Sequence, residues 1–289
     1  TPVASPESHG DEPLPLGPAY LELLFLRFFS RLHPREEADL AAWVARELPQ
    51  PFRLGTVCSG TDCPVLVWQG FAAAFRQYFH QEFKLEHAFS CEKAARKQKF
   101  LLKMFPDMPR LFADCAELGG AMAWDVKTNS RQPVLAASSL FGGFPCTDAS
   151  KLSRSSFSVE NRSCIQNASM RTGSVFASIV RWAKLHGGST AFIVLENVQA
   201  LMIPPKSGNQ VVGPDNLTVA VHTLSEELDY YTKVFLLDPR LFGVAQSRSR
   251  LWLCAAPRAS LRATGMTDAD ADELASEIMN RLVGSKPHK

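Results

Sequence analysis

Between residues 52 and 255, short apolar runs alternate with longer stretches that have the periodicity of amphipathic helices. Apolar runs of about four to eight residues are typical of buried strands, and stretches of about ten or more with apolar residues three and four apart are typical of helices. The alternation predicts an α/β fold with a doubly wound, mostly parallel sheet and helices on both faces. Predicted strands cover residues 52–58, 85–91, 111–113, 139–142, 191–195, 230–236 and 250–255, and predicted helices cover 65–79, 94–104, 174–185 and 217–228.

Composition divides the chain into four expected parts: a flexible leader (1–18), an N-terminal helical extension (19–51), a catalytic domain (52–257) and a C-terminal helical tail (258–289). The leader is rich in proline and has little apolar periodicity. The extension reads as two helices, at 19–31 and 34–48, and prolines close it. In the tail, residues 266–283 predict one amphipathic helix whose inward residues are Leu274, Ile278, Met279 and Leu282.

The charge balance excludes little, because 31 basic and 29 acidic residues leave a net charge of +2. A nucleic-acid enzyme needs only one basic cleft, so near-neutrality neither favours nor opposes such a partner. Seven cysteines without a Cys-x-x-Cys pair argue against a disulfide framework or a zinc site, and no metal is expected. Without an apolar run of about 18 residues or a signal peptide, an intracellular protein is expected and no membrane partner. Thr1 in place of Met suggests a processed product or a piece of a longer chain.

Ligands of parallel α/β sheets bind beyond the carboxyl ends of the strands, so the residues that follow each strand are the candidates for chemistry. The fourth predicted strand is followed by Gly142-Gly143-Phe144-Pro145-Cys146. The glycines and the proline fix a tight turn, and a thiol held there is a candidate nucleophile. Taken alone, the Pro-Cys pair is weak evidence, and an ordinary loop cysteine is the first interpretation of Cys146.

Two further motifs follow later strands. Leu195-Glu196-Asn197-Val198 places a carboxylate and an amide after a buried strand, which is costly unless the groups are paired or functional. Gln246-Ser247-Arg248-Ser249-Arg250 places two arginines on one face of an extended segment. Taken singly, the first motif is equally a helix cap and the second a solvated basic edge strand.

In combination, Phe-Pro-Cys, Glu-Asn-Val and Gln-x-Arg-x-Arg resemble three motifs of the cytosine C5-methyltransferases, in the same order. The stretch from Arg171 to Phe176 is similar to the segment after that family's mobile catalytic loop, and the likeness covers roughly residues 53–256. It implies a Rossmann-like fold of the class I AdoMet-dependent methyltransferases. It also implies that residues 147–170 form a loop that closes over a cytosine flipped out of a duplex.

The resemblance assigns roles to five residues. Cys146 would add to carbon 6 of the cytosine ring, Glu196 would contact N3 and the exocyclic amine, and Arg250 would bind O2. Arg248 and Asn197 would support the pocket.

The resemblance also assigns a cofactor site for S-adenosyl-L-methionine, around the first three strands. The family usually has Phe-x-Gly-x-Gly after the first strand. Here the stretch reads Cys58-Ser59-Gly60-Thr61-Asp62, so Cys58 stands at the aromatic position and Asp62 replaces the second glycine. Glu92 would bind the ribose hydroxyls and Asp114 the adenine amine, with Gly60, Thr61 and Pro145 beside them.

Family members usually continue into a target-recognition region, and no recognisable domain of this kind follows Ala256. A missing recognition domain or a partner chain is therefore expected. DNA is the expected substrate, and location in the nucleus is expected for a eukaryotic host. Cytosine methylation of RNA and a catalytically silent scaffold that binds AdoMet or nucleic acid are the alternatives. A dehydrogenase is excluded because its glycine fingerprint is absent.

Overall fold

The computed structural model describes residues 18–150, 158–186, 192–242 and 245–284, with the backbone alone for Pro18, Glu47, Phe242 and 281–284. The predicted leader therefore lies almost wholly outside the described residues. The chain forms two compact units, one of residues 1–48 with 64–85 and one of residues 49–63 with 86–289. The first unit groups the third helix with the two N-terminal helices, whereas the sequence-predicted domains end the extension at residue 51.

The first unit consists of α1 (Pro18–Phe29), α2 (Pro34–Glu47) and most of α3 (Cys63–Phe79). An aromatic cluster joins α1 to α3: the ring of Phe29, which is fully buried, lies 5.8 Å from Phe71 and 5.2 Å from Phe79, centre to centre. A Cβ at Gly70 would lie 2.7 Å from that of Leu21, so glycine allows the two helices to approach. Helix α2 is tied to α3 by the Tyr78 hydroxyl, which donates to Glu37 at 2.6 Å.

We predict that Phe29→Ala destabilises the first unit by about 3–5 kcal/mol, because it removes a buried aromatic ring and leaves a cavity. Urea unfolding followed by tryptophan fluorescence measures the change. The control is Phe28→Ala, since the neighbouring ring is 46% exposed and should cost much less. Equal effects of the two substitutions would contradict the packing described for Phe29.

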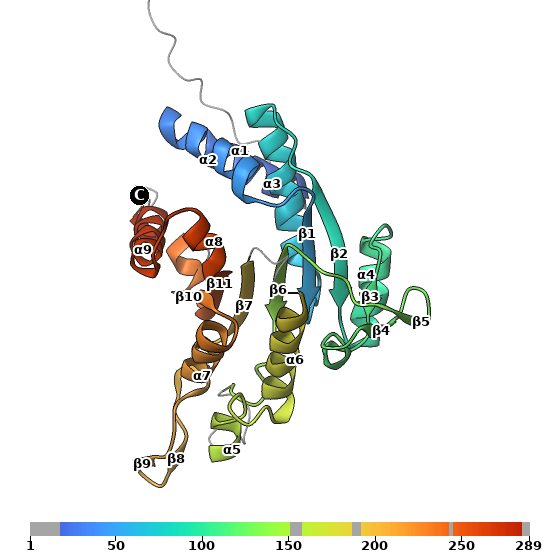
Figure 1. Ribbon diagram of the computed structural model, residues 1–289, viewed down its shortest axis with the longest axis vertical. Helices are drawn as coiled ribbons and strands as arrows, with labels where there is room; N and C mark the ends of the chain where they lie inside the picture. Colours follow the sequence, from blue (N-terminus) through green and yellow to red (C-terminus); the bar gives the residue numbers. More distant parts are fainter. Residues whose placement is uncertain (1–17, 151–157, 187–191, 243–244, 285–289) are drawn as a thin grey trace, which may run out of the picture. The chain divides into compact units, whose positions relative to one another are not determined.

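The second unit is built on a nine-stranded sheet with the order β10-β11-β7-β6-β1-β2-β3-β4-β5 (Figure 1). Strand β1 runs parallel to β6, β6 to β7, and β2 to β3, whereas both flanks of the sheet are antiparallel. The strands are β1 (Phe52–Val57), β2 (Leu85–Cys91), β3 (Leu111–Phe112), β4 (Met122–Asp125), β5 (Ser130–Pro133), β6 (Ser139–Gly143), β7 (Phe192–Val198), β10 (Tyr230–Leu237) and β11 (Arg250–Pro257). This mostly parallel core with antiparallel flanks confirms the predicted Rossmann-like α/β class.

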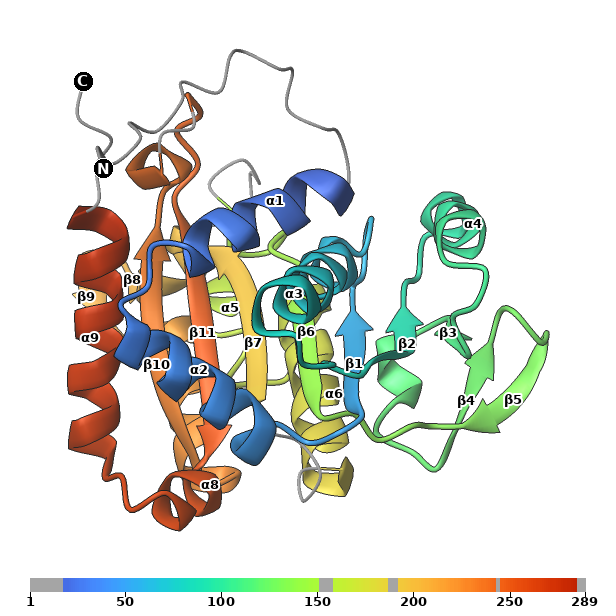
Figure 2. The ribbon, with the colours of Figure 1, turned by 90° about the horizontal axis from the view of Figure 1, so that it is seen from above.

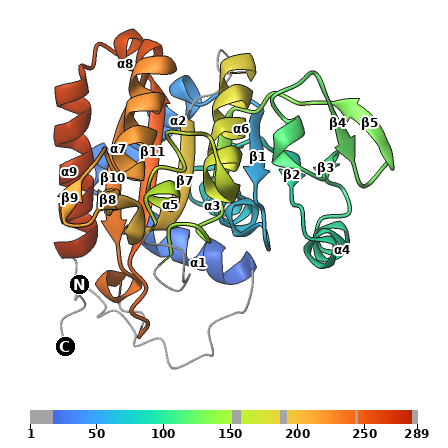
Figure 3. The same cartoon turned by 90° about the horizontal axis from the view of Figure 1, so that it is seen from below.

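Helices α6 and α7 lie on one face of this sheet (Figure 3). Trp182 of α6 is fully buried there, and its ring contacts Phe89 of β2. Helix α9 runs along β10 at the edge of the sheet, where Asp272 accepts hydrogen bonds from Tyr231 and Lys233 (Figure 2). The helices of this unit are α4 (Ala95–Met104), α5 (Val159–Arg162), α6 (Met170–His186), α7 (Asn216–His222), α8 (Arg258–Ala263) and α9 (Asp268–Gly284), and a small separate hairpin is formed by β8 (Lys206–Ser207) and β9 (Gln210–Val211).

Three expectations from the sequence need correction. Strands β4 and β5 were not expected, because each is only four residues long and β5 consists of polar residues and a proline. In the tail, Leu274 and Ile278 are each 46% exposed and do not face inward; α9 instead buries Ala271 beside the Asp272 contacts with β10. The predicted loop 147–170 contains the short helix α5 and buries Asn161, Arg162 and Cys164, whereas its residues 151–157 lie outside the described residues.

Candidate active site

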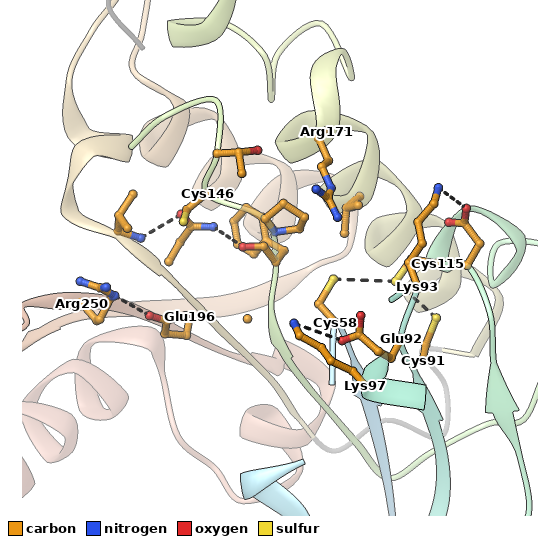
Figure 4. A pocket seen from close by; sticks show the side chains of 18 of the residues that line it. Cys58, Cys91, Glu92, Lys93, Lys97, Cys115, Cys146, Arg171, Glu196 and Arg250 are labelled. Atoms are coloured by element: carbon orange, nitrogen blue, oxygen red, sulfur yellow. Dashed lines mark hydrogen bonds and ion pairs between the residues drawn. The ribbon is translucent and has the colours of Figure 1, made fainter. Parts of the chain in front are cut away.

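A cavity of about 300 Å³ lies at the carboxyl ends of the central strands, where strand order reverses between β1 and β6. Figure 4 shows Cys146, Glu196 and Arg250 on one side of it and Cys58, Glu92 and Cys115 on the other. The predicted residues that line it are Cys58, Glu92, Asp114, Pro145, Cys146, Glu196, Asn197, Arg248 and Arg250. The structure thus gathers both halves of the predicted site in one pocket.

Cys146 follows β6 on a turn that two glycines permit. A Cβ at Gly142 would lie 2.5 Å from the Cγ2 atom of Val57, so a side chain would force β1 and β6 apart. A Cβ at Gly143 would lie 3.3 Å from the Glu196 carboxylate. Glycine at both positions therefore brings the turn before Cys146 close to its neighbours.

Backbone contacts then fix the segment around Cys146. The Asn197 side chain donates to the carbonyl oxygen of Phe144 at 3.0 Å, which joins the end of β7 to the end of β6. The buried guanidinium of Arg162 donates to the carbonyls of Ala149 and Ala200, at 3.2 and 2.7 Å. Hydrogen bonds to buried carbonyls are hard to replace, so these contacts give the cysteine a defined position.

The segment after the predicted loop also reaches the pocket. Asp148 accepts a hydrogen bond from the backbone of Thr172 at 2.6 Å and so ties the Cys146 segment to the start of α6. A Cβ at Gly173 would lie 1.9 Å from the carbonyl oxygen of Cys164, which leaves room only for glycine. Arg171, between these contacts and the cavity, lines the pocket.

Glu196 and Arg250 form an ion pair with 2.9 Å between the carboxylate and Nε. They lie on the antiparallel strands β7 and β11, where Glu196 is opposite Trp252 and Arg250 opposite Val198. Glu196 is one of the last three residues of β7, whereas the sequence analysis placed it after the strand. Burial raises the pKa of Glu196, although Arg250 and Arg248 act in the opposite direction. The carboxyl is therefore easier to protonate than an exposed glutamate.

On the other side of the pocket, the Glu92 carboxylate is 6% exposed and accepts hydrogen bonds from the backbone of Gly60 and Ala94, each at 2.9 Å. Lys97 lies 3.7 Å away. Asp114 caps the short helix that follows β3 and pairs with Lys93 at 2.7 Å. Burial opposes ionisation of Asp114, but Lys93 and the Ala116 backbone outweigh it and lower its pKa. Both carboxylates are placed to accept hydrogen bonds from a polar ligand.

Gly60, Thr61 and Asp62 do not line the cavity. Gly60 contacts it indirectly through Glu92, and the exposed Thr61 pairs with Cys63. Asp62 is fully buried and accepts a hydrogen bond from Ser90, which also contacts His87. The position of the missing second glycine thus carries a buried polar network instead of a ligand contact.

Asp62 and His87 of this network should change the free energy of unfolding in opposite directions as the pH changes. Burial raises the pKa of Asp62 from 3.8 to about 6, so ionisation lowers the free energy of unfolding as the pH rises through that window. Burial lowers the pKa of His87 from 6.5 to about 4, so protonation lowers the same free energy as the pH falls. Each effect is roughly 3 kcal/mol, and they nearly cancel between pH 4 and 6.5.

We predict that Asp62→Asn leaves only the histidine effect, so its melting temperature climbs from pH 4.5 to 6.5 more steeply than that of the wild type. His87→Gln should show the reverse trend. Scanning calorimetry at several pH values measures both. Parallel pH profiles for the three proteins would rule out opposed titration of Asp62 and His87.

The pocket also contains residues to which the sequence analysis gave no role. Among them are Lys93, Lys97, Arg171, Cys91 and Cys115. Four of them lie within a few residues of Glu92 or Asp114, so the rule that sites follow strand ends could have found them. Within the described ranges, no group of His, Cys, Asp and Glu is arranged to hold a metal ion, and no helix has the length and hydropathy that a membrane span needs.

Comparison with known proteins shows the family. A sequence model described as C-5 cytosine-specific DNA methylase matches residues 72–287, well over half of the chain. The chain belongs to this family. The match includes every catalytic residue predicted above.

Curated relatives of this methylase-family chain are fungal. It is 26% identical over 240 residues to DNA (cytosine-5-)-methyltransferase DMT5 of Cryptococcus neoformans, which covers 83% of this chain and 9% of that protein. It is 33% identical over 105 residues to DMT5 of Verticillium dahliae, covering 35% of this chain and 4% of that protein. The chain thus spans less than a tenth of the length of either relative.

Solved structures with detectable likeness include the Dnmt2 methyltransferase of S. pombe, with a TM-score of 0.44 and 12% identity over 71% of this chain and 49% of that chain. The Entamoeba histolytica methyltransferase EhMeth has a TM-score of 0.42 and 12% identity, over 72% of this chain and 53% of that chain.

Proposed function

We propose that this chain transfers a methyl group from S-adenosyl-L-methionine to carbon 5 of cytosine in DNA, through a covalent bond between Cys146 and carbon 6. The observation that carries the proposal is the convergence of Cys146, Glu196 and Arg250 in one pocket. The motif order, the family and the names of the fungal relatives support DNA as the substrate. Because those relatives are eukaryotic, we place the activity in the nucleus.

The residues of the other half of the pocket suit the cofactor. The whole cavity, of about 300 Å³, is at the lower end of the usual range for a small ligand, and the buried Glu92 carboxylate is suited to ribose hydroxyls. Asp114 would accept from the adenine amine, with Cys58 and Pro145 beside the base. When bound there, S-adenosyl-L-methionine supplies an electrophilic methyl group.

The chain's own residues make the cytosine reactive. The Cys146 thiolate forms a bond to carbon 6, and the electrons of the 5,6 double bond shift so that carbon 5 becomes nucleophilic. After methylation, the carbon-5 proton passes to solvent water, and its bonding electrons restore the 5,6 double bond as the bond from sulfur to carbon 6 breaks. Cys146 leaves with the electrons of that bond, as the thiolate that entered.

Glu196 and Arg250 stabilise the charge that this addition creates. Negative charge develops at N3 and O2 of the ring, and a protonated Glu196 donates at N3 while the Arg250 guanidinium donates at O2. The raised pKa of Glu196 supports the protonated form. Asn197 positions the reacting cysteine through the Phe144 carbonyl. In a duplex, the cytosine has to leave the base stack before Cys146 reaches carbon 6.

Methyl transfer from radiolabelled S-adenosyl-L-methionine to DNA and to transfer RNA tests the proposal. We expect label in DNA, and a loss of at least about a thousandfold with Cys146→Ser, because oxygen is a far weaker nucleophile here. Cys254→Ala is the matched control, since that thiol lies in β11 and does not line the pocket. If only RNA became labelled, RNA and not DNA would be the substrate. Equal rates for Cys146→Ser and the wild type would overturn the mechanism.

The pH dependence tests Glu196 separately. Because the protonated carboxyl acts, kcat/KM should fall as the pH rises through the raised pKa of Glu196. Glu196→Gln donates a hydrogen bond but transfers no proton, so it should be about a hundredfold or more slower and should lack this fall. A variant that keeps this fall would show that another group causes it.

A further inference from the structure

Three thiols meet in the cofactor side of the cavity. Cys58 follows β1, Cys91 ends β2 and Cys115 lies shortly after β3, and all three line the pocket. The sulfur of Cys115 lies 3.5 Å from that of Cys91 and 4.0 Å from that of Cys58 (Figure 4). Among the described residues no other cysteine sulfurs approach each other this closely. The methyl transfer proposed above has no step for this thiol cluster.

The spacing is close to that of a disulfide. A disulfide has a sulfur–sulfur bond of about 2.0 Å, so Cys91 and Cys115 would have to approach by about 1.5 Å. Their strands are adjacent and parallel, since Cys91 pairs in register with Phe112, three residues before Cys115. Both backbones therefore already lie side by side.

The three thiols differ in character. The sulfur of Cys115 lies within hydrogen-bonding distance of the thiols of Cys58 and Cys91, and these contacts lower the pKa of Cys115. The same contacts, together with burial, raise the pKa of Cys58 and of Cys91. Of the three thiols, Cys115 is the one whose ionised form its neighbours favour, and a thiolate is the form that attacks an oxidant.

We propose that the thiol cluster of Cys58, Cys91 and Cys115 is an oxidation site, in which peroxide joins Cys91 to Cys115 and thereby closes the pocket to S-adenosyl-L-methionine. The Cys115 thiolate attacks hydrogen peroxide, takes one oxygen as a sulfenic acid and releases hydroxide, which is protonated to water. The Cys91 thiol then displaces the sulfenic oxygen as a second water and forms the disulfide. Two thiols and one peroxide give one disulfide and two waters.

Closure of the pocket follows from the neighbours of these thiols, and this half of the inference rests on the proposed function. Cys91 directly precedes Glu92, and Asp114 directly precedes Cys115. A bond that draws the two sulfurs together moves the backbone that carries both carboxylates. Since an intracellular compartment keeps thiols reduced, such a bond would be reversible there.

The test treats the reduced chain with hydrogen peroxide and digests it with trypsin without reduction. The three thiols fall on separate peptides, 54–76, 85–93 and 111–127, and Cys63→Ala removes the second cysteine of the first peptide. We expect mass spectrometry to find peptide 85–93 joined to 111–127, with loss of two hydrogen atoms. Binding of S-adenosylhomocysteine, measured by calorimetry, should weaken at least about tenfold and recover with dithiothreitol.

Each half of the proposal has its own control. Cys115→Ala and, as a second variant in case the first folds poorly, Cys91→Ala should form no such link, and their binding before and after peroxide should match. Cys254→Ala should behave as the wild type, and S-adenosylhomocysteine bound in advance should slow the linking.

Absence of the link, or a link that leaves binding unchanged, would overturn the inference. If the reduced chain bound no S-adenosylhomocysteine, the proposed cofactor would fail, and with it the closure, while the link would still decide the thiol chemistry.

Discussion

The ladder of β6, β7 and β11 fixes the relative height of the reacting groups. Gly143 pairs with Glu196, and Val198 pairs with Arg250, so three distant stretches of the chain end at one level. Backbone hydrogen bonds set this register, and a shift of one residue would turn each side chain to the other face of the sheet. The contact of Asn197 with the Phe144 carbonyl then extends the same register to the turn before Cys146.

The cofactor side is held differently. Its residues belong to strand ends and short turns, and their contacts are mainly side chain to backbone, as with Glu92 and the Gly60 amide. By the resemblance described above, the chain differs here from the usual Phe-x-Gly-x-Gly, with Cys58 at the aromatic position and Asp62 in place of the second glycine. Both replacing residues make contacts of their own: Cys58 belongs to the thiol cluster, and Asp62 accepts a hydrogen bond from Ser90 in a buried network. A site held by turns tolerates such replacements more readily than a strand ladder does.

Much of the fold could be predicted from the sequence, because buried strands and amphipathic helices have distinct periodicities. The central strands and the motifs at their ends follow from local pattern alone. The β4–β5 hairpin could not, since each of its strands has only four residues, which is too short a run for its alternation to stand out. The sequence predicted the wrong buried face for α9, because Leu274 and Ile278 make an apolar stripe. The contacts of Asp272 with β10 instead decide which face of the helix packs against the sheet. Proximity of Cys91 to Cys115 depends on strand order, which no local pattern encodes.

The direction of β11 determines where the chain can accept an insertion close to the pocket. Because β11 is antiparallel to β7, its first residue, Arg250, lies at the pocket, and the connection from β10 arrives at the pocket's rim. Asp238 accepts from Ser249 at 2.7 Å and so clasps the two ends of this connection. Additional residues inserted between Asp238 and Ser249 would lie beside the active site and would leave the pairing of the strands unchanged. An insertion in this connection could therefore contact the substrate.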